Sequence, residues 1–203
     1  TVSISPDGTR LALDIGSVDE DIWIWDLDLE NISQLTFDES RNVRPIWTPD
    51  GNWIIFCSDR EGTPSIFRKP ADGAGVAESL AEMPDEAIEY IKKGMRLNPF
   101  PEPFYYIDLG RCYTLKGEYE KALSEFKKAL QRAPESPPLH FHLAVTYILL
   151  DREEEARAST AKCLELAPFV SVSWVSKVYR GKNQAHLKLI VDAMRKAGFP
   201  EGS

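Results

Sequence analysis

Two Ser-x-x-Lys sequences come closest to a catalytic arrangement in this chain. They are Ser124–Lys127 and Ser159–Lys162. On a helix, residues three apart lie on one face, so the lysine amine could act as a base for the serine hydroxyl. Neither sequence has the Lys-Thr-Gly or Ser-Asp-Asn companion of such sites, and the sequence contains no phosphate-binding glycine loop. We therefore expect no enzymatic activity within these residues and no cofactor.

A stretch of acidic side chains could supply oxygen ligands to calcium. The spacing of an EF-hand loop is absent, and such a run usually forms a solvated loop. The histidines are weaker candidates, because His140 and His142 cannot face one point on a helix and His186 has no metal-ligating residue close to it in the sequence. We expect no metal site and keep calcium as the alternative. The acidic residues are Asp14, Asp19, Glu20, Asp21, Asp26 and Asp28.

The three cysteines, Cys57, Cys112 and Cys163, are far apart, and none belongs to a Cys-x-x-Cys pair. A disulfide framework and a zinc site are both disfavoured. Each cysteine lies among periodic apolar residues, where a free thiol acts as a small hydrophobic side chain. Reduced cysteines slightly favour a cytoplasmic location. The sequence begins at Thr1 inside a repeat pattern, so we expect a fragment of a longer chain and leave its compartment open.

Charge divides the chain into two parts. Residues 1–80 carry 15 acidic and 6 basic side chains, a net charge of −9, whereas residues 81–203 carry 17 acidic and 18 basic ones, a net charge of +1. Neither part has the basic patch that a phosphate backbone requires, so nucleic-acid binding is disfavoured. No apolar run reaches the length of a membrane span. The difference in charge indicates two domains.

The first eighty residues consist of short β-like runs separated by turn signals. Two Pro-Asp-Gly triplets, at Pro6 and Pro49, stand 43 residues apart, which is the length of one propeller blade. In each triplet the proline, aspartate and glycine suit a tight turn between paired strands. The expected strands are Thr9–Ile15, Asp21–Leu27, Ile32–Phe37, Val43–Trp47, Asn52–Ser58, Pro64–Lys69 and Val76–Leu80.

These runs resemble the TolB-type, WD-repeat-like propeller blades of bacterial proteins. The resemblance rests on SPDGTRLAL and on WTPDGNWIIFCSDREG, and it covers about residues 1–80. It implies an interaction surface, or a sensor arm of a larger signalling protein, rather than catalysis. A closed propeller has roughly four to eight blades, whereas about two fit here. Two blades leave open edges, through which the chain could associate with itself.

After residue 83 the apolar period becomes helical. Small and aromatic residues recur at the spacing of a tetratricopeptide repeat of about 34 residues. Counted from Pro103, they are Tyr106, Leu109, Gly110, Tyr113, Gly117, Tyr119, Ala122, Phe126, Ala129 and Pro134. The pattern returns more loosely from Pro137, and a final helix from about Gln184 to Ala197 would cap the array. This part resembles the tetratricopeptide tails of bacterial cyclase-like and kinase-like signalling proteins.

The predicted fold class is α+β with two domains, a partial antiparallel propeller followed by an all-α array of helical hairpins. The predicted boundaries are 1–80 for the blades, 81–83 for the junction and 84–201 for the array. Within the array we expect a lone second helix at 84–98, repeats at 103–136 and 137–170, and a degenerate repeat with its cap at 171–199.

The tetratricopeptide resemblance places one set of side chains along a concave groove. They are mostly apolar and lack the Lys and Asn pattern that clamps a carboxylate terminus. Either this strip packs on the chain's own capping helix or blades, or it holds an apolar helix or extended peptide of a partner. The expected function is a protein-interaction scaffold; the alternative is a regulatory appendage of a kinase or cyclase whose catalytic domain lies outside the chain. The groove residues are Phe104, Ile107, Arg111, Phe141, Val145, Ile148, Val172 and Val175.

Overall fold

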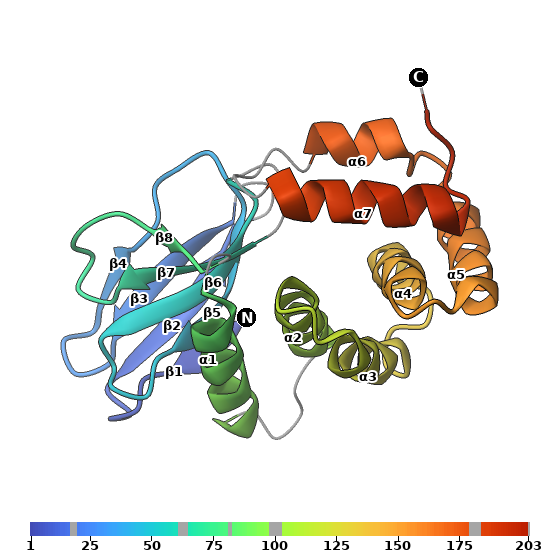
Figure 1. Cartoon of the computed structure of the whole chain (residues 1–203). Helices are drawn as coiled ribbons and strands as arrows, with labels where there is room; N and C mark the ends of the chain where they lie inside the picture. The colour runs from blue at the N-terminus through green and yellow to red at the C-terminus, as the bar shows by residue number, and fades with distance from the viewer. Residues whose placement is uncertain (17–19, 61–64, 81–82, 98–102, 179–183, 203) are drawn as a thin grey trace. The chain divides into compact units, whose positions relative to one another are not determined.

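In the computed structural model, the chain forms two compact units, Thr1–Pro99 and Phe100–Ser203 (Figure 1). No helix among the described residues combines the length and the apolarity needed to cross a membrane. The described residues are 1–16, 20–60, 65–80, 83–97, 103–178 and 184–202.

The strands of the first unit form two antiparallel sheets of four strands, each paired in chain order, and the sheets do not close into a ring. The first sheet contains β1 (Val2–Ile4), β2 (Arg10–Ile15), β3 (Asp21–Asp26) and β4 (Asn31–Gln34). The second contains β5 (Asn42–Trp47), β6 (Trp53–Ser58), β7 (Ser65–Pro70) and β8 (Glu78–Ser79). The prediction of two four-stranded blades is confirmed, with strand ends shifted by a few residues.

The Pro-Asp-Gly turns join β1 to β2 and β5 to β6. The Asp7 carboxylate accepts hydrogen bonds from the Ser5 hydroxyl at 2.6 Å and from the Thr9 backbone N–H at 3.1 Å. These bonds lower the pKa of Asp7 to about 2. Asp50 makes the same bonds one blade later, and the glycines after the two aspartates adopt φ of 76° and 69°. The turns therefore fix the register of both hairpins.

The two sheets pack face to face through a shared apolar core. Trp47 belongs to this core and is only 2% exposed. Its indole N–H donates a hydrogen bond to the Ser3 carbonyl at 3.1 Å, and the Arg10 guanidinium lies 4.6 Å from its ring centroid. These contacts tie the first sheet to the second. The core residues are Ala12, Ile22, Ile24, Leu35, Trp47, Ile54, Phe56, Phe67 and Ala71.

Helix α1 (Pro84–Leu97) belongs to the first unit. We expected it to be a lone helix of the helical array, beginning just after a junction at 81–83. Instead it contacts β5, and its Glu86 pairs with Arg68 of β7 at 2.9 Å. Its inward residues Ala87 and Ile91 are 0% and 3% exposed. The first compact unit therefore ends after α1, because the apolar face of this helix packs on the sheet.

The second unit is entirely helical. Helices α2 and α3 pack together as one hairpin, and α4 and α5 as the next, as the two predicted repeats require. Part of the predicted degenerate repeat, residues 179–183, lies outside the described residues. The helices are α2 (Pro103–Leu115), α3 (Tyr119–Leu130), α4 (Pro137–Leu149), α5 (Glu153–Leu166), α6 (Val172–Val178) and α7 (Gln184–Ala197).

The first hairpin shows why the repeat spacing needs its small residues. A Cβ added to Gly110 would lie 2.4 Å from the Phe126 ring, so α2 and α3 approach each other more closely there than any larger residue allows. Phe126 is 0% exposed, and so is Ala122 beside it on α3. Gly117 follows α2 with a φ of 74°, which a glycine adopts without strain.

Candidate functional site

The predicted groove residues come from three helices and are mostly covered. Of the eight, six are at most 7% exposed, while Ile107 and Arg111 are half-buried. The strip is therefore not an open surface in this structure. The covered residues are Phe104, Phe141, Val145, Ile148, Val172 and Val175.

Helix α7 is the element that packs on the α4 part of this strip. Directly after α7, the ring of Phe199 meets the ring of Phe141 edge to face, with centroids 5.8 Å apart. On α7 itself, Ile190 and Met194 are 4% and 0% exposed. Phe141, Val145 and Ile148 share one face of α4 by their spacing. Of the two alternatives left by the sequence, the structure thus shows the chain's own last helix against the α4 strip.

The segment after α7 is tied to the start of α6. The backbone N–H of Val172 donates to the Pro200 carbonyl at 2.9 Å, and that of Ser173 donates to the Glu201 carbonyl at 2.8 Å. The Arg195 guanidinium also pairs with the Glu201 carboxylate at 2.8 Å. These bonds hold the C-terminal end of α7 against the start of α6, where Val172 and Val175 are buried.

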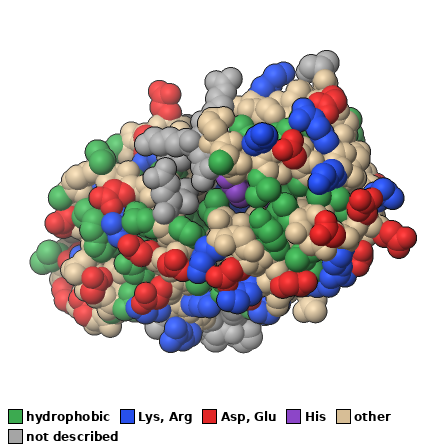
Figure 2. Space-filling view, in the orientation of Figure 1, with side chains coloured by type: hydrophobic (Ala, Val, Ile, Leu, Met, Phe, Trp, Pro, Cys, Tyr) green, Lys and Arg blue, Asp and Glu red, His purple; other side chains and the backbone are tan. Residues whose placement is uncertain are grey.

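A polar group interrupts the apolar strip where α2, α4 and α7 meet. Arg111 pairs with the Asp108 carboxylate of the same helix at 3.6 Å. The imidazole of His142 stacks on Phe126, with centroids 5.2 Å apart. Burial, aided by the positive charge of Arg111, lowers the pKa of His142 to about 3 and also lowers that of His186 on α7. Both imidazoles are therefore neutral near pH 7. Figure 2 shows the distribution of hydrophobic, charged and histidine side chains over one face of the molecule.

Sequence reasoning treated His142 only as a weak metal ligand and did not single out Asp108. The i,i+3 spacing of Asp108 and Arg111 was the available signal, since such a pair shares one helix face. The role of His142 had no local signal, because the ring that it stacks on belongs to another hairpin.

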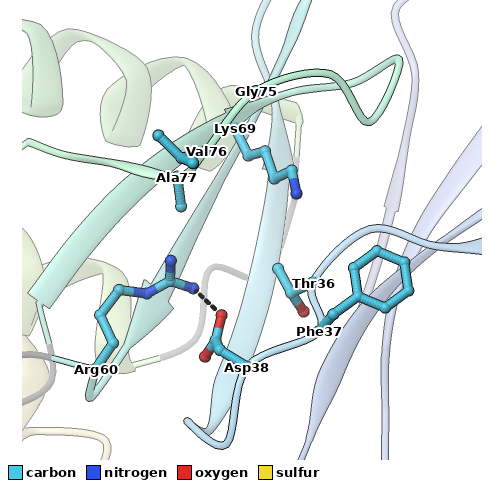
Figure 3. Close-up of a pocket in the computed structure, with 8 residues that line it drawn as sticks. All are labelled: Thr36, Phe37, Asp38, Arg60, Lys69, Gly75, Val76 and Ala77. Atoms are coloured by element: carbon cyan, nitrogen blue, oxygen red, sulfur yellow. Dashed lines mark hydrogen bonds and ion pairs between the residues drawn. The ribbon is translucent and has the colours of Figure 1, made fainter.

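The first unit contains a pocket of about 290 Å³ (Figure 3). The Arg60 guanidinium crosses it to the Asp38 carboxylate at 2.9 Å and also donates to the Asn42 side-chain oxygen at 2.8 Å. Its positive charge is thus already compensated. The sequence analysis did not identify this pocket. Its lining residues are Thr36, Phe37, Asp38, Arg60, Lys69, Gly75, Val76 and Ala77.

Two aspartates of the acidic stretch, Asp14 and Asp21, bind other groups of the first unit. Asp14 pairs with the amino group of Thr1 and accepts the Arg44 backbone N–H at 2.9 Å. Asp21 accepts the Thr36 hydroxyl at 2.6 Å. Asp19 lies outside the described residues. Among the described residues, no three His, Cys, Asp or Glu side chains are grouped as a metal ion requires.

The second Ser-x-x-Lys pair and the cysteines take part in contacts within the fold. Lys162 pairs with Glu165 at 2.9 Å and with Glu135 at 3.3 Å. The hydrogen bond to Glu165 raises the pKa of Lys162. The Lys162 ammonium therefore stays protonated and cannot act as a base for Ser159. All three cysteines are buried. Burial raises the pKa of Cys112 to about 12 and that of Cys163 to about 11, so neither is a reactive thiolate.

Family models match both parts of the chain. Residues 2–85 match a TolB beta propeller domain, and residues 113–168 match a tetratricopeptide repeat. An uncharacterized protein of Agrobacterium fabrum is 40% identical over 74 residues, which amount to 36% of this chain and 25% of that protein. The chain thus spans about a quarter of the length of that relative.

Two solved structures resemble separate parts of the chain. TolB from Acinetobacter baumannii is 32% identical over 39% of this chain and 20% of its own, with a TM-score of 0.34. PcrH, solved in complex with the chaperone binding region of PopB, is 22% identical over 57% of this chain and 82% of its own, with a TM-score of 0.42.

Proposed function

We propose that this chain, which joins a TolB-type β-propeller segment to tetratricopeptide repeats, is a non-enzymatic protein-interaction scaffold whose helical unit binds an apolar helix of a partner protein. The binding surface is the face of α2 and α4 that carries Phe104, Ile107, Arg111, Phe141 and Val145. One observation carries the proposal: an amphipathic helix, α7, already lies against the α4 part of this face.

Helix α7 indicates the chemistry of a suitable partner. It presents aliphatic and small residues at helical spacing, and an aromatic ring follows its last turn. A partner helix of the same pattern would bury comparable apolar surface in the groove, which is the usual mode of helix recognition by a helical groove. The neutral histidines and the Arg111–Asp108 pair at one end would accept polar rather than apolar groups. The buried residues of α7 are Ile190, Ala193, Met194 and Ala197.

Competition with α7 determines how tightly the groove binds a partner helix. A segment of the same chain acts at an effective concentration in the millimolar range, so a free helix at micromolar concentration rarely displaces it. A partner must therefore bind more tightly than α7, or act when α7 has been released. Helix α7 would thus occupy the groove until a suitable partner helix displaces it.

The experiment uses a labelled peptide of residues 184–201 and the full chain. In the variant Ile190→Asp with Met194→Asp, two carboxylates replace buried side chains and weaken the packing of the chain's own α7. Fluorescence anisotropy should then show the peptide binding at least about tenfold more tightly to the variant than to the unaltered chain, because its intramolecular competitor is weaker.

Two controls accompany this measurement. Lys188→Asp changes an exposed residue of α7 and should leave peptide binding as in the unaltered chain. A peptide with the same two aspartates should bind neither form. If the variant keeps its circular dichroism yet does not gain affinity for the peptide, the groove is not a helix acceptor. If α2 to α5 unfold with the variant, the strip is core and the proposal also fails.

A further inference from the structure

One lysine of the second sheet lies on the side of that sheet that faces the core. Cross-strand partners point to the same side of a sheet, and Lys69 of β7 pairs in register with the core residue Ile54 of β6. A lysine on such a side is unusual, because burying an ammonium group costs free energy unless an opposite charge compensates it. Lys69 is half-buried, and its ammonium lies 5.9 Å from the centroid of the Phe37 ring, near the limit of a cation–π contact.

The Lys69 side chain extends into the pocket of about 290 Å³ in the first unit (Figure 3). The other charged groups of this pocket already have partners, because Arg60 pairs with Asp38 at 2.9 Å. The Thr36 hydroxyl is also used within the fold, since it donates to a carboxylate at 2.6 Å and accepts a backbone N–H at 2.9 Å. Lys69 is the charged lining residue without an opposite charge beside it in the described part of the chain. A ligand that compensates this charge is an anion.

Apolar side chains from two separate segments stand on either side of this ammonium. Phe37, between β4 and β5, is 72% exposed, and Val76, between β7 and β8, is 79% exposed. Figure 3 shows them on opposite sides of the Lys69 nitrogen, with Ala77 next to Val76. A concave site that combines apolar walls with one precisely placed polar group is the usual form of a small-molecule pocket. The walls therefore suit an apolar group attached to the anion.

We propose that this pocket binds a small molecule with one carboxylate and a short aromatic body. The carboxylate accepts charge-assisted hydrogen bonds from the Lys69 ammonium, and the aromatic body lies between Phe37 and Val76. The volume is near the lower end of the usual range for ligand pockets, so the ligand is about the size of a phenyl-substituted acid. A second carboxylate is disfavoured, because residues 1–80 already carry a net charge of −9.

Phenylacetate is the probe, and its binding to the full chain is followed by titration in proton–nitrogen correlation NMR spectra. The dissociation constant should be about 0.1–1 mM, as expected for a ligand of this size. Phenylacetamide has the same shape without the charge, and acetate has the charge without the ring. Each should bind at least about tenfold more weakly than phenylacetate, because each lacks one of the two recognised groups.

Substitutions of Lys69 test the same contact from the protein side. Lys69→Gln should weaken phenylacetate binding at least about tenfold, whereas Lys69→Arg, which keeps the charge, should retain the affinity within about threefold. Lys92→Gln is the matched control. It removes one positive charge from an exposed position of α1 that does not line the pocket, and it should leave binding unchanged.

Each contrary result overturns the proposal. A chain whose signals show no saturable change up to ~10 mM phenylacetate has no such site. If phenylacetamide binds as tightly as phenylacetate, or if Lys69→Gln leaves the affinity unchanged, Lys69 does not recognise a carboxylate and instead only discourages pairing at the sheet edge. Signal changes confined to the helical unit would place the binding in the α4 groove. Should Lys69→Gln lose the dispersed spectrum of a folded chain, Phe37→Ser takes its place, and unchanged affinity in that folded variant is equally contrary.

Discussion

Replacing Gly110 with alanine sets two opposite effects against each other. In a helix interior alanine is more favourable than glycine by about 1 kcal/mol, so α2 alone would gain stability. Against this, the new methyl carbon would lie 2.4, 2.6 and 2.7 Å from three carbons of the Phe126 ring. Carbon atoms pack at about 3.5–4 Å, so the ring would have to move by roughly 1 Å.

The ring has little room for such a movement. Phe126 is 0% exposed, and its ring stacks on His142 with an interplanar angle of 5°. Overpacking of this kind costs about 1–3 kcal/mol. The clash should therefore outweigh the gain in helix propensity, and Gly110→Ala should lower the free energy of unfolding of the helical unit by up to about 2 kcal/mol.

Urea denaturation of the full chain, followed by far-ultraviolet circular dichroism, measures this difference. Ser124→Ala, at an exposed position of α3, is the control and should change stability by less than about 0.5 kcal/mol. In the Phe126→Leu background, Gly110→Ala should cost less, because the smaller side chain removes the clash. A Gly110→Ala chain as stable as the original, or more stable, would refute the close approach of α2 and α3 at this residue.

Two further predictions concern pH and the place of α1. The pKa of His142 is about 3 in the folded chain and 6.5 for an ordinary histidine, so between these pH values the unfolded chain binds a proton that the folded chain does not. The free energy of unfolding therefore falls as pH drops through this window, by up to about 1.4 kcal/mol per pH unit. His142→Gln should flatten this slope in pH-dependent denaturation, and an unchanged slope would show that the imidazole titrates normally. Ile91→Asp should destabilise the first unit by at least about 2 kcal/mol in tryptophan fluorescence, because four of the five tryptophans lie there; a loss confined to the helical unit would instead place α1 with the tetratricopeptide array.

Much of the fold followed from local spacing. The Pro-Asp-Gly triplets predicted the two hairpins, because Asp7 and Asp50 bond the backbone within their own turns. The helical hairpins followed from the positions of Gly110 and Phe126, whose contact joins neighbouring helices along the chain. The sequence matches to TolB propeller and tetratricopeptide domains confirm both resemblances. In each case the interacting residues are close in sequence, so that periodicity carries the information.

The sequence did not predict which surface each apolar stripe would cover. The apolar stripe of α1 led us to predict a helix of the helical array, yet α1 packs on the sheet that contains β5. The groove offsets of Phe141 and Val145 identified an apolar face of α4 but left its occupant open between α7, the blades and a partner. The stacking of His142 on Phe126 and the pocket beside Arg60 had no signal in the spacing.

The amino-acid sequence by itself determined the type and order of the elements and the blade and repeat periods. Only the tertiary structure decided that α7 covers the α4 strip, that α1 covers the second sheet, and that Lys69 lines a pocket. The physical reason is that burial of apolar surface is favourable but non-directional. Periodicity shows that a face must be covered, whereas the shape and position of distant segments select what covers it.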